Sequence, residues 1–350
     1  MARQPEMRDE GEFGLIARLA ERLARAGRPE PPGAKVHVGI GDDAAVTVPA
    51  GATITSTEAL IEGAHFRRDT APPRSIGRKA LAAALSDLAA MGAAPGEAYV
   101  ALGIPDDLDE AACLELYDGI GAIAAESGTA VLGGDLARAP VLVLAVTVVG
   151  HAPSGGAVVG RDGASPDQAL AVTGELGGAA AGLLLLERPE LSSSLDPDAA
   201  AALRERQLEP SPRLAAGAAL ASTGATAMID VSDGLGADAG QIAAASGVRA
   251  VIELERLPVQ PGVVDVAAAA ELDPRDLAAA GGEDYELLVA LPMAGVEDAA
   301  AAASAAGTPL RVIGRTVRGE GVELREPDGS TRPASGFDHL RHRRSGGGPD

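Results

Sequence analysis

The sequence predicts an α/β protein, in the wide sense that includes α+β, built from two domains. Strand-like and helix-like segments alternate in both halves of the chain, and a segment rich in Gly, Pro and Ser interrupts the alternation at residues 151–168. The length of 350 residues also exceeds what one ordinary hydrophobic core organises. We therefore expect an N-terminal domain over residues 11–152, a C-terminal domain over 153–340, and disordered ends at 1–10 and 341–350.

The N-terminal half is predicted to open with a helix and to continue with a mixed sheet. Apolar residues recur at helical spacing over residues 11–27, and Gly27 follows them as a C-cap residue does. Hydrophobic periodicity places the other elements of this half, with strands at 35–40, 52–57, 99–104, 129–132 and 141–149 and helices at 75–91 and 108–127.

The C-terminal half repeats the alternation after the Gly/Pro/Ser-rich segment. The same criteria predict strands at 169–173, 225–231, 248–254, 285–291 and 311–317, and helices at 179–187, 211–223, from about Ser232, and at 294–306. The turn from strand to helix at 173–182 is rich in Gly but lacks the order GxGxxG and a Lys, so it is weak as a phosphate-binding loop.

Charge and composition exclude several classes of protein. A formal net charge of −21 disfavours binding to nucleic acid or to anionic lipid. An acidic chain that handles phosphate groups needs divalent cations between its carboxylates and the substrate. The single cysteine, Cys113, lies in a helical pattern and is expected in the core. No apolar run reaches the roughly 18 residues that span a bilayer, and no signal peptide is evident, so we expect a cytoplasmic protein.

Carboxylates occur at positions where a core or a strand end is predicted. Asp87 is the only charged residue in the stretch 80–95, on an apolar helix face, where an isolated carboxylate is unfavourable unless it is paired or binds a metal. A basic side chain or a helix N-terminus from elsewhere would satisfy it equally well. Both explanations remain open at this point.

Further acidic residues lie beside glycines at strand ends. Asp42 and Asp43 follow Gly41, where a simple turn is the alternative, and Asp135 follows a Gly pair. Asp230 ends a predicted strand, and the acids of 281–288 follow another Gly pair. Together these carboxylates fit oxygen-only Mg²⁺ sites better than they fit separate turns.

Two short stretches carry polar residues whose ordinary role is also plausible. Ser232 is placed to N-cap a helix, with Asp233 in its first turn. The stretch STEALIEGAHF carries Glu58 and His65, and we interpret its Glu62 as a solvated loop charge. Zinc spacings, a GxxxxGK[ST] loop and a Ser/His/Asp or Cys/His triad are not found in the sequence.

The ordered set of these segments resembles the thiamine-monophosphate kinases, a family of the aminoimidazole-ribonucleotide-synthase-like superfamily. The similarity covers nearly the whole chain through GEFGLIARL, GIGDDAAV, EGAHF, KALAAALSDLAAMGA, GGD, VTGELGGAAAGL, DVSDGL, GGEDYEL and GFDHL. The resemblance implies the two-domain fold of that superfamily, ATP-dependent phosphorylation of thiamine monophosphate to thiamine diphosphate with Mg²⁺, and a homodimer whose N-terminal sheets join in a barrel-like core.

The resemblance also implies site residues, position by position. Those that fall on metal-binding positions are Asp43, Ser56, Thr57, Glu58, Asp87, Asp135, Asp230 and Asp233. Those that fall on ATP-binding positions are Gly134, Asp135, Arg161 and Ser232. Those that fall on substrate-contacting positions are His65, Glu283 and Phe337, where Glu283 would meet either the aminopyrimidine or the thiazolium and Phe337 would stack on the ring system. No general base is expected, because the acceptor phosphate is already anionic.

The chain departs from the family pattern at three positions. Members usually carry Asp at the position of Glu58, Thr at that of Leu136 and Asn at that of Ala84. Two alternatives therefore stay open: another ATP-using enzyme of the superfamily, similar to aminoimidazole ribonucleotide synthase, or a catalytically impaired dimer that binds Mg-nucleotide. The selenophosphate synthetases and the hydrogenase-maturation relatives need a cysteine near one terminus, and this chain has none there.

Overall fold

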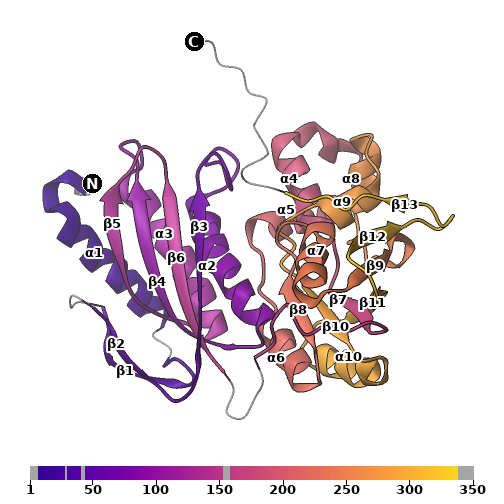
Figure 1. Ribbon diagram of the computed structural model, residues 1–350. Helices are drawn as coiled ribbons and strands as arrows, with labels where there is room; N and C mark the ends of the chain where they lie inside the picture. Colours follow the sequence, from indigo (N-terminus) through magenta and orange to yellow (C-terminus); the bar gives the residue numbers. More distant parts are fainter. Residues whose placement is uncertain (1–6, 28–29, 41–43, 153–157, 338–350) are drawn as a thin grey trace. The chain divides into compact units, whose positions relative to one another are not determined.

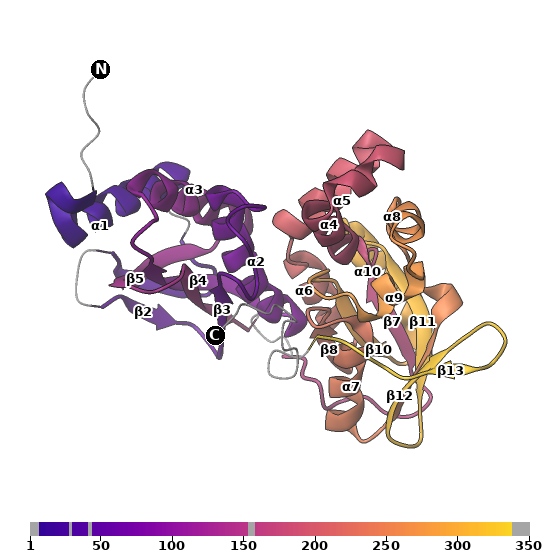
Figure 2. The same cartoon turned by 90° about the horizontal axis from the view of Figure 1, so that it is seen from above.

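The computed structural model describes residues 7–27, 30–40, 44–152 and 158–337 (Figures 1 and 2). The chain forms two compact units. The N-terminal unit comprises Met1–Gly160, Leu208–Ala225 and Glu297–Pro309, and the C-terminal unit comprises Arg161–Gln207, Thr226–Val296 and Leu310–Asp350. Because each unit is assembled from separate segments, a single boundary between 152 and 153 remains a prediction.

The N-terminal unit is built on a four-stranded sheet of order β3-β6-β4-β5. β6 is antiparallel to both β3 and β4, whereas β4 and β5 run parallel. Its elements are α1 (Met7–Ala26), β1 (Ala34–Val38), β2 (Val46–Pro49), β3 (Thr53–Ile61), α2 (Pro73–Ala90), β4 (Ala94–Ile104), α3 (Glu110–Ser127), β5 (Ala130–Arg138), β6 (Val143–His151) and α6 (Leu214–Ser222). β1 and β2 form a separate antiparallel hairpin.

The two faces of this sheet have different surroundings. α2 packs against β3, β4 and β6 and against α3, and Figure 2 shows both helices on one side of the sheet. Side chains alternate between the faces along a strand, and the register puts Glu58, Val146 and Val100 in one row and Thr57, Thr147 and Tyr99 in the next. The valines of the first row are fully buried, whereas Thr57 of the second row is exposed.

Glycines set the separation of α2 and α3. A Cβ added to Gly77 in α2 would lie 1.9 Å from the Leu116 carbonyl oxygen, and one added to Gly119 in α3 would lie 1.9 Å from the Arg74 carbonyl oxygen. The two helices therefore touch backbone to backbone, as small residues at a helix crossing allow. The tight contact fixes the position of α2, and with it that of Asp87.

The C-terminal unit is built on a seven-stranded sheet of order β13-β12-β9-β11-β7-β10-β8, in which only β9 and β12 pair in parallel among the described strands. Its strands are β7 (Ala169–Thr173), β8 (Ala227–Asp230), β9 (Arg249–Glu253), β10 (Leu287–Leu291), β11 (Leu310–Val317), β12 (Gly321–Arg325) and β13 (Thr331–Arg332). Its helices are α4 (Gly178–Glu187), α5 (Pro197–Leu208), α7 (Leu235–Ser246), α8 (Val263–Ala269) and α9 (Pro274–Ala280). α10 (Val296–Ala305) connects β10 to β11.

Two clusters of apolar side chains hold this unit together. The larger one lies between the sheet and α7, where Leu235 and Ile242 join Ile229 and Leu288 of the strands. The smaller one joins α4, α5 and α8 through Leu185, Leu203 and Val266. Burial of these side chains is the main favourable contribution to folding of the unit.

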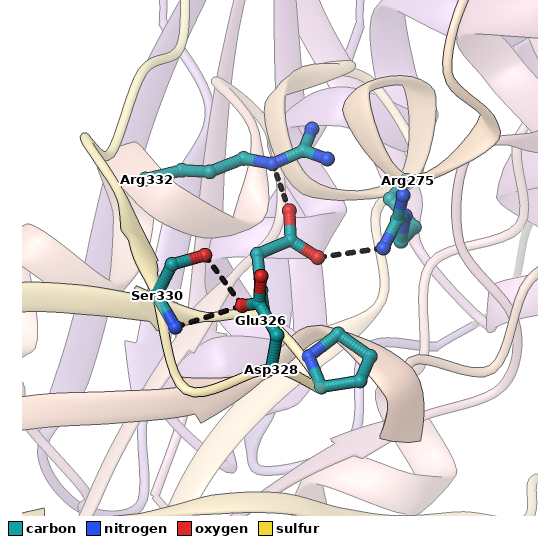
Figure 3. Close-up of a pocket in the computed structure, with 6 residues that line it drawn as sticks. Arg275, Glu326, Asp328, Ser330 and Arg332 are labelled. Carbon is teal, nitrogen blue, oxygen red and sulfur yellow. Dashed lines mark hydrogen bonds and ion pairs between the residues drawn. The ribbon is translucent and has the colours of Figure 1, made fainter.

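An ion-pair cluster ties α9 to the hairpin of β12 and β13. Glu326 accepts hydrogen bonds from Arg275 Nη1 at 2.6 Å and from Arg332 Nε, and Figure 3 shows its carboxylate between the two guanidinium groups. Asp273 pairs with Arg275 Nη2 at 2.9 Å and with Arg332 Nη2 at 2.7 Å. The adjoining hollow has a volume of about 380 Å³. The arginine and glutamate side chains that line this hollow are already paired with one another. We therefore interpret the cluster as a structural contact and not as a ligand site.

The fold class predicted from the sequence is confirmed, with α and β elements in both units. Cys113 is buried in α3 as predicted, and burial raises the pKa of its thiol to about 12. The predicted disorder over residues 1–10 is wrong in part, because α1 already begins at Met7. The predicted tail at 341–350 lies outside the described residues. None of the helices in the described ranges is long and apolar enough to cross a membrane.

We predict that Gly119→Ala lowers the stability of the protein by about 1–3 kcal/mol or more, because the added methyl group meets backbone that cannot move away. The matched control is Gly240→Ala in α7, where the nearest atom to an added Cβ is 3.8 Å away. That change should be neutral or stabilising by about 0.5–1 kcal/mol. Thermal unfolding of both variants checks the prediction, and equal midpoints would contradict it.

We predict that Asp273→Asn lowers stability at pH 7 and flattens its dependence on acid. Hydrogen bonds from Arg275 first, and then from Arg332, hold the pKa of Asp273 well below its usual range. The ionised Asp273 therefore contributes fully to the free energy of unfolding above the pKa of an unfolded aspartate, roughly 3.9. This contribution is lost as pH falls from there towards the lower pKa of Asp273 in the folded protein. Urea unfolding at pH 7, 5 and 3 measures this, with the exposed Asp265→Asn as control. An unchanged pH slope would refute it.

Candidate functional site

The first group of predicted site residues lies where β3 faces α2. Ser56 Oγ of β3 donates to Asp87 Oδ2 of α2 across 2.5 Å, so a hydroxyl from a neighbouring strand is one partner of this carboxylate. Glu58 is two residues further along β3, on the same face of the strand and half-buried. Ser56, Glu58 and Asp87 thus offer only oxygen atoms as possible metal ligands on this face.

Thr57 and Asp135 belong to the opposite face of the same sheet. Thr57 Oγ1 and Thr147 Oγ1 are 2.9 Å apart, and the register carries Asp135 to the Thr57 side of the sheet, next to Ala101. Gly134 precedes it, where an added Cβ would lie 2.0 Å from the Val100 carbonyl oxygen. The side chain of Thr57 therefore points away from Asp87, and only its backbone oxygen is available to join Ser56 in binding one ion. The predicted ligand Asp43 lies outside the described residues.

The turn after β3 is held by hydrogen bonds within it. The backbone N–H of Ile61 donates to His65 Nδ1 at 3.0 Å. A neutral ring that accepts at Nδ1 carries its proton on Nε2, which makes His65 a donor at that atom. The interpretation of Glu62 as a solvated loop charge is wrong. Its carboxylate pairs with Arg68 Nε at 2.7 Å and accepts from the Leu142 N–H at 3.1 Å.

The second group lies at the start of α7, where the prediction of a Ser232 N-cap is wrong. The helix begins at Leu235 behind Gly234, whose φ of 115° suits glycine alone. The backbone N–H groups of Ser232, Asp233 and Gly234 all donate to Asp238 Oδ2, at 3.1, 3.2 and 3.1 Å. Asp238, which the sequence analysis did not single out, therefore accepts from the N–H groups before α7, and the Ser232 side chain does not cap the helix.

Carboxylates gather around this loop. Asp230 at the end of β8 is buried, and Asp233 is half-buried three residues on. Burial, and after it the nearby charges of Asp230 and Asp233, raise the pKa of Asp238 to about 8 against the opposing effect of the N–H groups. Like charges this close disfavour full ionisation unless a cation is present.

The loop also binds two of the predicted substrate-contacting residues through its carbonyl groups. The Glu283 N–H donates to the Ser232 carbonyl at 2.8 Å, and the Phe337 N–H donates to the Asp233 carbonyl at 2.9 Å. Phe337 is 42% exposed, so its ring is available to a ligand. Ser232, Asp233, Glu283 and Phe337 are thus brought together from three separate parts of the chain.

Glu283 sits in a turn with unusual backbone. Glu283 has a φ of 67° and Tyr285 a φ of 50°, both in the left-handed region that non-glycine residues rarely occupy. Between them, Asp284 accepts from the N–H groups of Gly177 at 2.6 Å and Ala179 at 3.0 Å. A carboxylate of the same unit therefore caps the start of α4 and occupies N–H groups of the Gly-rich turn. Burial raises the pKa of Asp284 to about 6.

The described contact of Arg161 lies away from these groups. Its side chain is exposed, and its carbonyl accepts a hydrogen bond from Ser246 Oγ at 2.8 Å, at the other end of α7 from Asp233. The proposed role of this cation therefore depends on a ligand that extends beyond the loop. Within the described ranges, His, Cys, Asp and Glu side chains do not form groups of three or more that could hold a metal ion by themselves.

Comparison with known proteins identifies the family. Residues 41–152 match the N-terminal domain, and residues 165–326 the C-terminal domain, of the AIR synthase related proteins. The thiamine-monophosphate kinase of Mycobacterium tuberculosis H37Rv is 40% identical over 286 residues, 81% of each chain. That of Escherichia coli K12 is 37% identical over 338 residues, 94% of this chain and 98% of the relative.

Solved structures agree with the sequence relatives. The crystal structure of thiamine-monophosphate kinase from Stenotrophomonas maltophilia K279a has a TM-score of 0.78 and 35% identity, covering 92% of this chain and 98% of that one. AaThiL complexed with AMPPCP and TMP has a TM-score of 0.73 and 29% identity, covering 96% and 99%. Escherichia coli HypE, a hydrogenase maturation protein, shares the fold at 21% identity and a TM-score of 0.73. The chain belongs to the AIR synthase related family and, within it, to the thiamine-monophosphate kinases.

Proposed function

We propose that this protein transfers the γ-phosphoryl group of ATP to thiamine monophosphate and so forms thiamine diphosphate and ADP. One observation of the structure carries the proposal. Residues expected to contact metal, nucleotide and substrate, namely Asp233, Ser232, Glu283 and Phe337, converge on one loop through two backbone hydrogen bonds. The solved relative that holds both AMPPCP and TMP matches over 96% of this chain, which is the comparison that supports it best.

Magnesium fits the donor set of the protein. Ser56, Glu58 and Asp87 on one sheet face, and Asp230 and Asp233 beside α7, offer oxygen atoms and neither sulfur nor imidazole nitrogen. Mg²⁺ binds through one or two carboxylates and completes its shell with water and substrate phosphate. This mode of binding needs few protein ligands, so it is compatible with the finding that no group of three or more His, Cys, Asp or Glu side chains that could hold a metal ion occurs in the described ranges. Bound there, the ions would offset the charge of two polyanionic substrates.

The proposed roles divide the site residues into three sets. For metal binding we propose Asp43, Ser56, Thr57, Glu58, Asp87, Asp135, Asp230 and Asp233, with Thr57 acting through its backbone oxygen. For ATP we propose Gly134, Asp135, Arg161 and Ser232. For the acceptor we propose His65 as a donor at Nε2, Glu283 as the partner of a cationic or amino group, and Phe337 as a stacking face.

The chemistry needs positioning more than proton transfer. An oxygen of the acceptor phosphate attacks the γ-phosphorus, and the bond from that phosphorus to the β,γ-bridging oxygen breaks as ADP leaves. The attacking oxygen is anionic near neutral pH, so no side chain has to remove a proton. What this chain must supply is an in-line arrangement of both substrates. The backbone anchoring of Glu283 and Phe337 supports such an arrangement.

We also propose a homodimer and a cytoplasmic location. The sheet face that carries Thr57, Ala59, Ile61 and Ala101 is exposed at these positions, and three of the four are apolar. A second copy that covers this face would bury it, in line with an apolar sheet face that needs a partner layer. The single buried cysteine suits a reducing compartment.

A product assay tests the function. Wild-type protein with ATP, Mg²⁺ and thiamine monophosphate should yield thiamine diphosphate, and Asp87→Asn should lower kcat/KM by roughly a hundredfold or more, since metal-held charge stabilisation is worth several kcal/mol. Glu115→Gln, at an exposed site on α3, is the control and should retain wild-type rates. Nucleotide binding without any product would instead favour the impaired dimer.

We predict that Glu58→Asp raises activity. Glutamate is longer than aspartate by one methylene, roughly 1.5 Å, and octahedral Mg²⁺ geometry at short distances is sensitive to that difference. Because Glu58 shares the Ser56 face of β3, the shorter side chain would bind the ion from the same side. Steady-state kinetics against Mg²⁺ concentration measure the effect. An unchanged or lower kcat would mean that the site has adapted to glutamate.

A further inference from the structure

The end of α5 contacts the strained turn that carries Glu283. This turn, residues 281–286 and hereafter the GGEDYE turn, follows α9 and precedes β10. Two consecutive residues of α5, Arg206 and Gln207, hydrogen-bond to it. Neither residue was singled out by the sequence or by the proposed function, and α5 itself was not predicted.

Gln207 binds the functional group of the turn directly. Its side-chain Nε2 donates to Glu283 Oε2 at 2.7 Å, and the glutamine is only 5% exposed. An amide N–H that donates to a carboxylate makes a charge-assisted bond, stronger than one between neutral groups. This bond restricts the rotation of the Glu283 carboxylate.

Arg206 holds the backbone around Glu283. Its Nη2 donates to the Asp284 carbonyl at 2.8 Å and pairs with the fully buried carboxylate of Glu286. Glu286 also accepts from Thr173 Oγ1 at 2.7 Å. Arg206 is therefore part of the buried framework of the turn, whereas Gln207 contacts only the Glu283 side chain among the hydrogen bonds described for it.

The backbone of the turn indicates that this arrangement serves a ligand. Two non-glycine residues in the left-handed region, at φ 67° and 50°, persist only when surrounding contacts impose them, and such strain concentrates at functional sites. The contacts that impose it here are the bonds from Glu283 N–H to the Ser232 carbonyl, from Tyr285 N–H to the Val231 carbonyl, and from Arg206. Gln207 adds the orientation of the side chain.

We propose that Gln207 is a positioning residue that orients the Glu283 carboxylate towards the organic, non-phosphate part of the acceptor, and so determines specificity for that part. The inference rests on the proposed function. A carboxylate held in advance by a buried amide loses little freedom on binding, which improves affinity for a cationic or amino-bearing ring. Loss of the amide should affect binding of the acceptor and leave the nucleotide side unchanged.

The test compares Gln207→Ala and the near-isosteric Gln207→Glu with wild type in steady-state kinetics. We expect KM for thiamine monophosphate to rise about tenfold or more in both variants, because each loses one hydrogen bond to a charged group. KM for ATP should stay within about twofold of wild type. Glu205→Gln, exposed on the same helix, should behave as wild type and controls for changes in α5.

A double-mutant cycle with Glu283→Ala separates positioning from simple stabilisation. If Gln207 acts through Glu283, adding Gln207→Ala to Glu283→Ala should raise KM for the acceptor by less than about twofold, because the effects of coupled residues are not additive. Gln207→Asn, which keeps a shorter amide, should fall between Gln207→Ala and wild type. Additive effects, or equal increases in KM for both substrates, would overturn the inference. A wild-type protein that forms no thiamine diphosphate would overturn the proposed function instead.

Discussion

The Asp238 carboxylate is the interaction on which the candidate site of the C-terminal unit depends. One of its oxygens accepts three consecutive N–H groups, from Ser232 to Gly234, and so turns this backbone with its donors inward. The carbonyl groups of Ser232 and Asp233 are then available on the other side, where they accept from Glu283 and Phe337. A helix that began at Ser232, as its capping preference suggests, would direct those carbonyls along the helix axis and leave neither segment anchored.

The same arrangement concentrates negative charge. Asp230, Asp233 and Asp238 come together within nine residues of a chain whose formal net charge is −21. Three N–H donors to Asp238 reduce the repulsion, and a bound cation would reduce it further. Arginines compensate elsewhere: Arg206 pairs with Glu286 beneath the GGEDYE turn, and Arg275 and Arg332 pair with Asp273 and Glu326 at the hairpin. Arginine thus offsets the acidic character at the turn and at the hairpin, whereas backbone N–H groups do so for Asp238 beside α7.

The sequence predicted those parts of the fold whose signal is local. Hydrophobic periodicity located α1, α2, α3 and most strands, because each buries one apolar stripe or face. It missed α5, whose buried stripe consists of Ala200, Leu203 and Gln207. Because the third buried position is a glutamine, the hydrophobic periodicity of α5 is not apparent in the sequence. A polar residue that continues an apolar stripe nevertheless indicates a buried hydrogen bond. The role of Asp238 was missed for another reason: its three partners precede it in a loop whose geometry no pattern specifies.

The candidate metal residues on β3 show the same limit at the scale of one strand. Ser56, Thr57 and Glu58 read as one consecutive ligand set, yet a strand sends alternate side chains to opposite faces. Accordingly, Ser56 hydrogen-bonds to Asp87 on the helix-covered face, and Thr57 hydrogen-bonds to Thr147 on the other face. A single ion can therefore be bound by all three residues only if Thr57 contributes its carbonyl oxygen. Since every residue type has a carbonyl oxygen, an ion bound in this way would not constrain the side chain at position 57, which contacts Thr147 on β6.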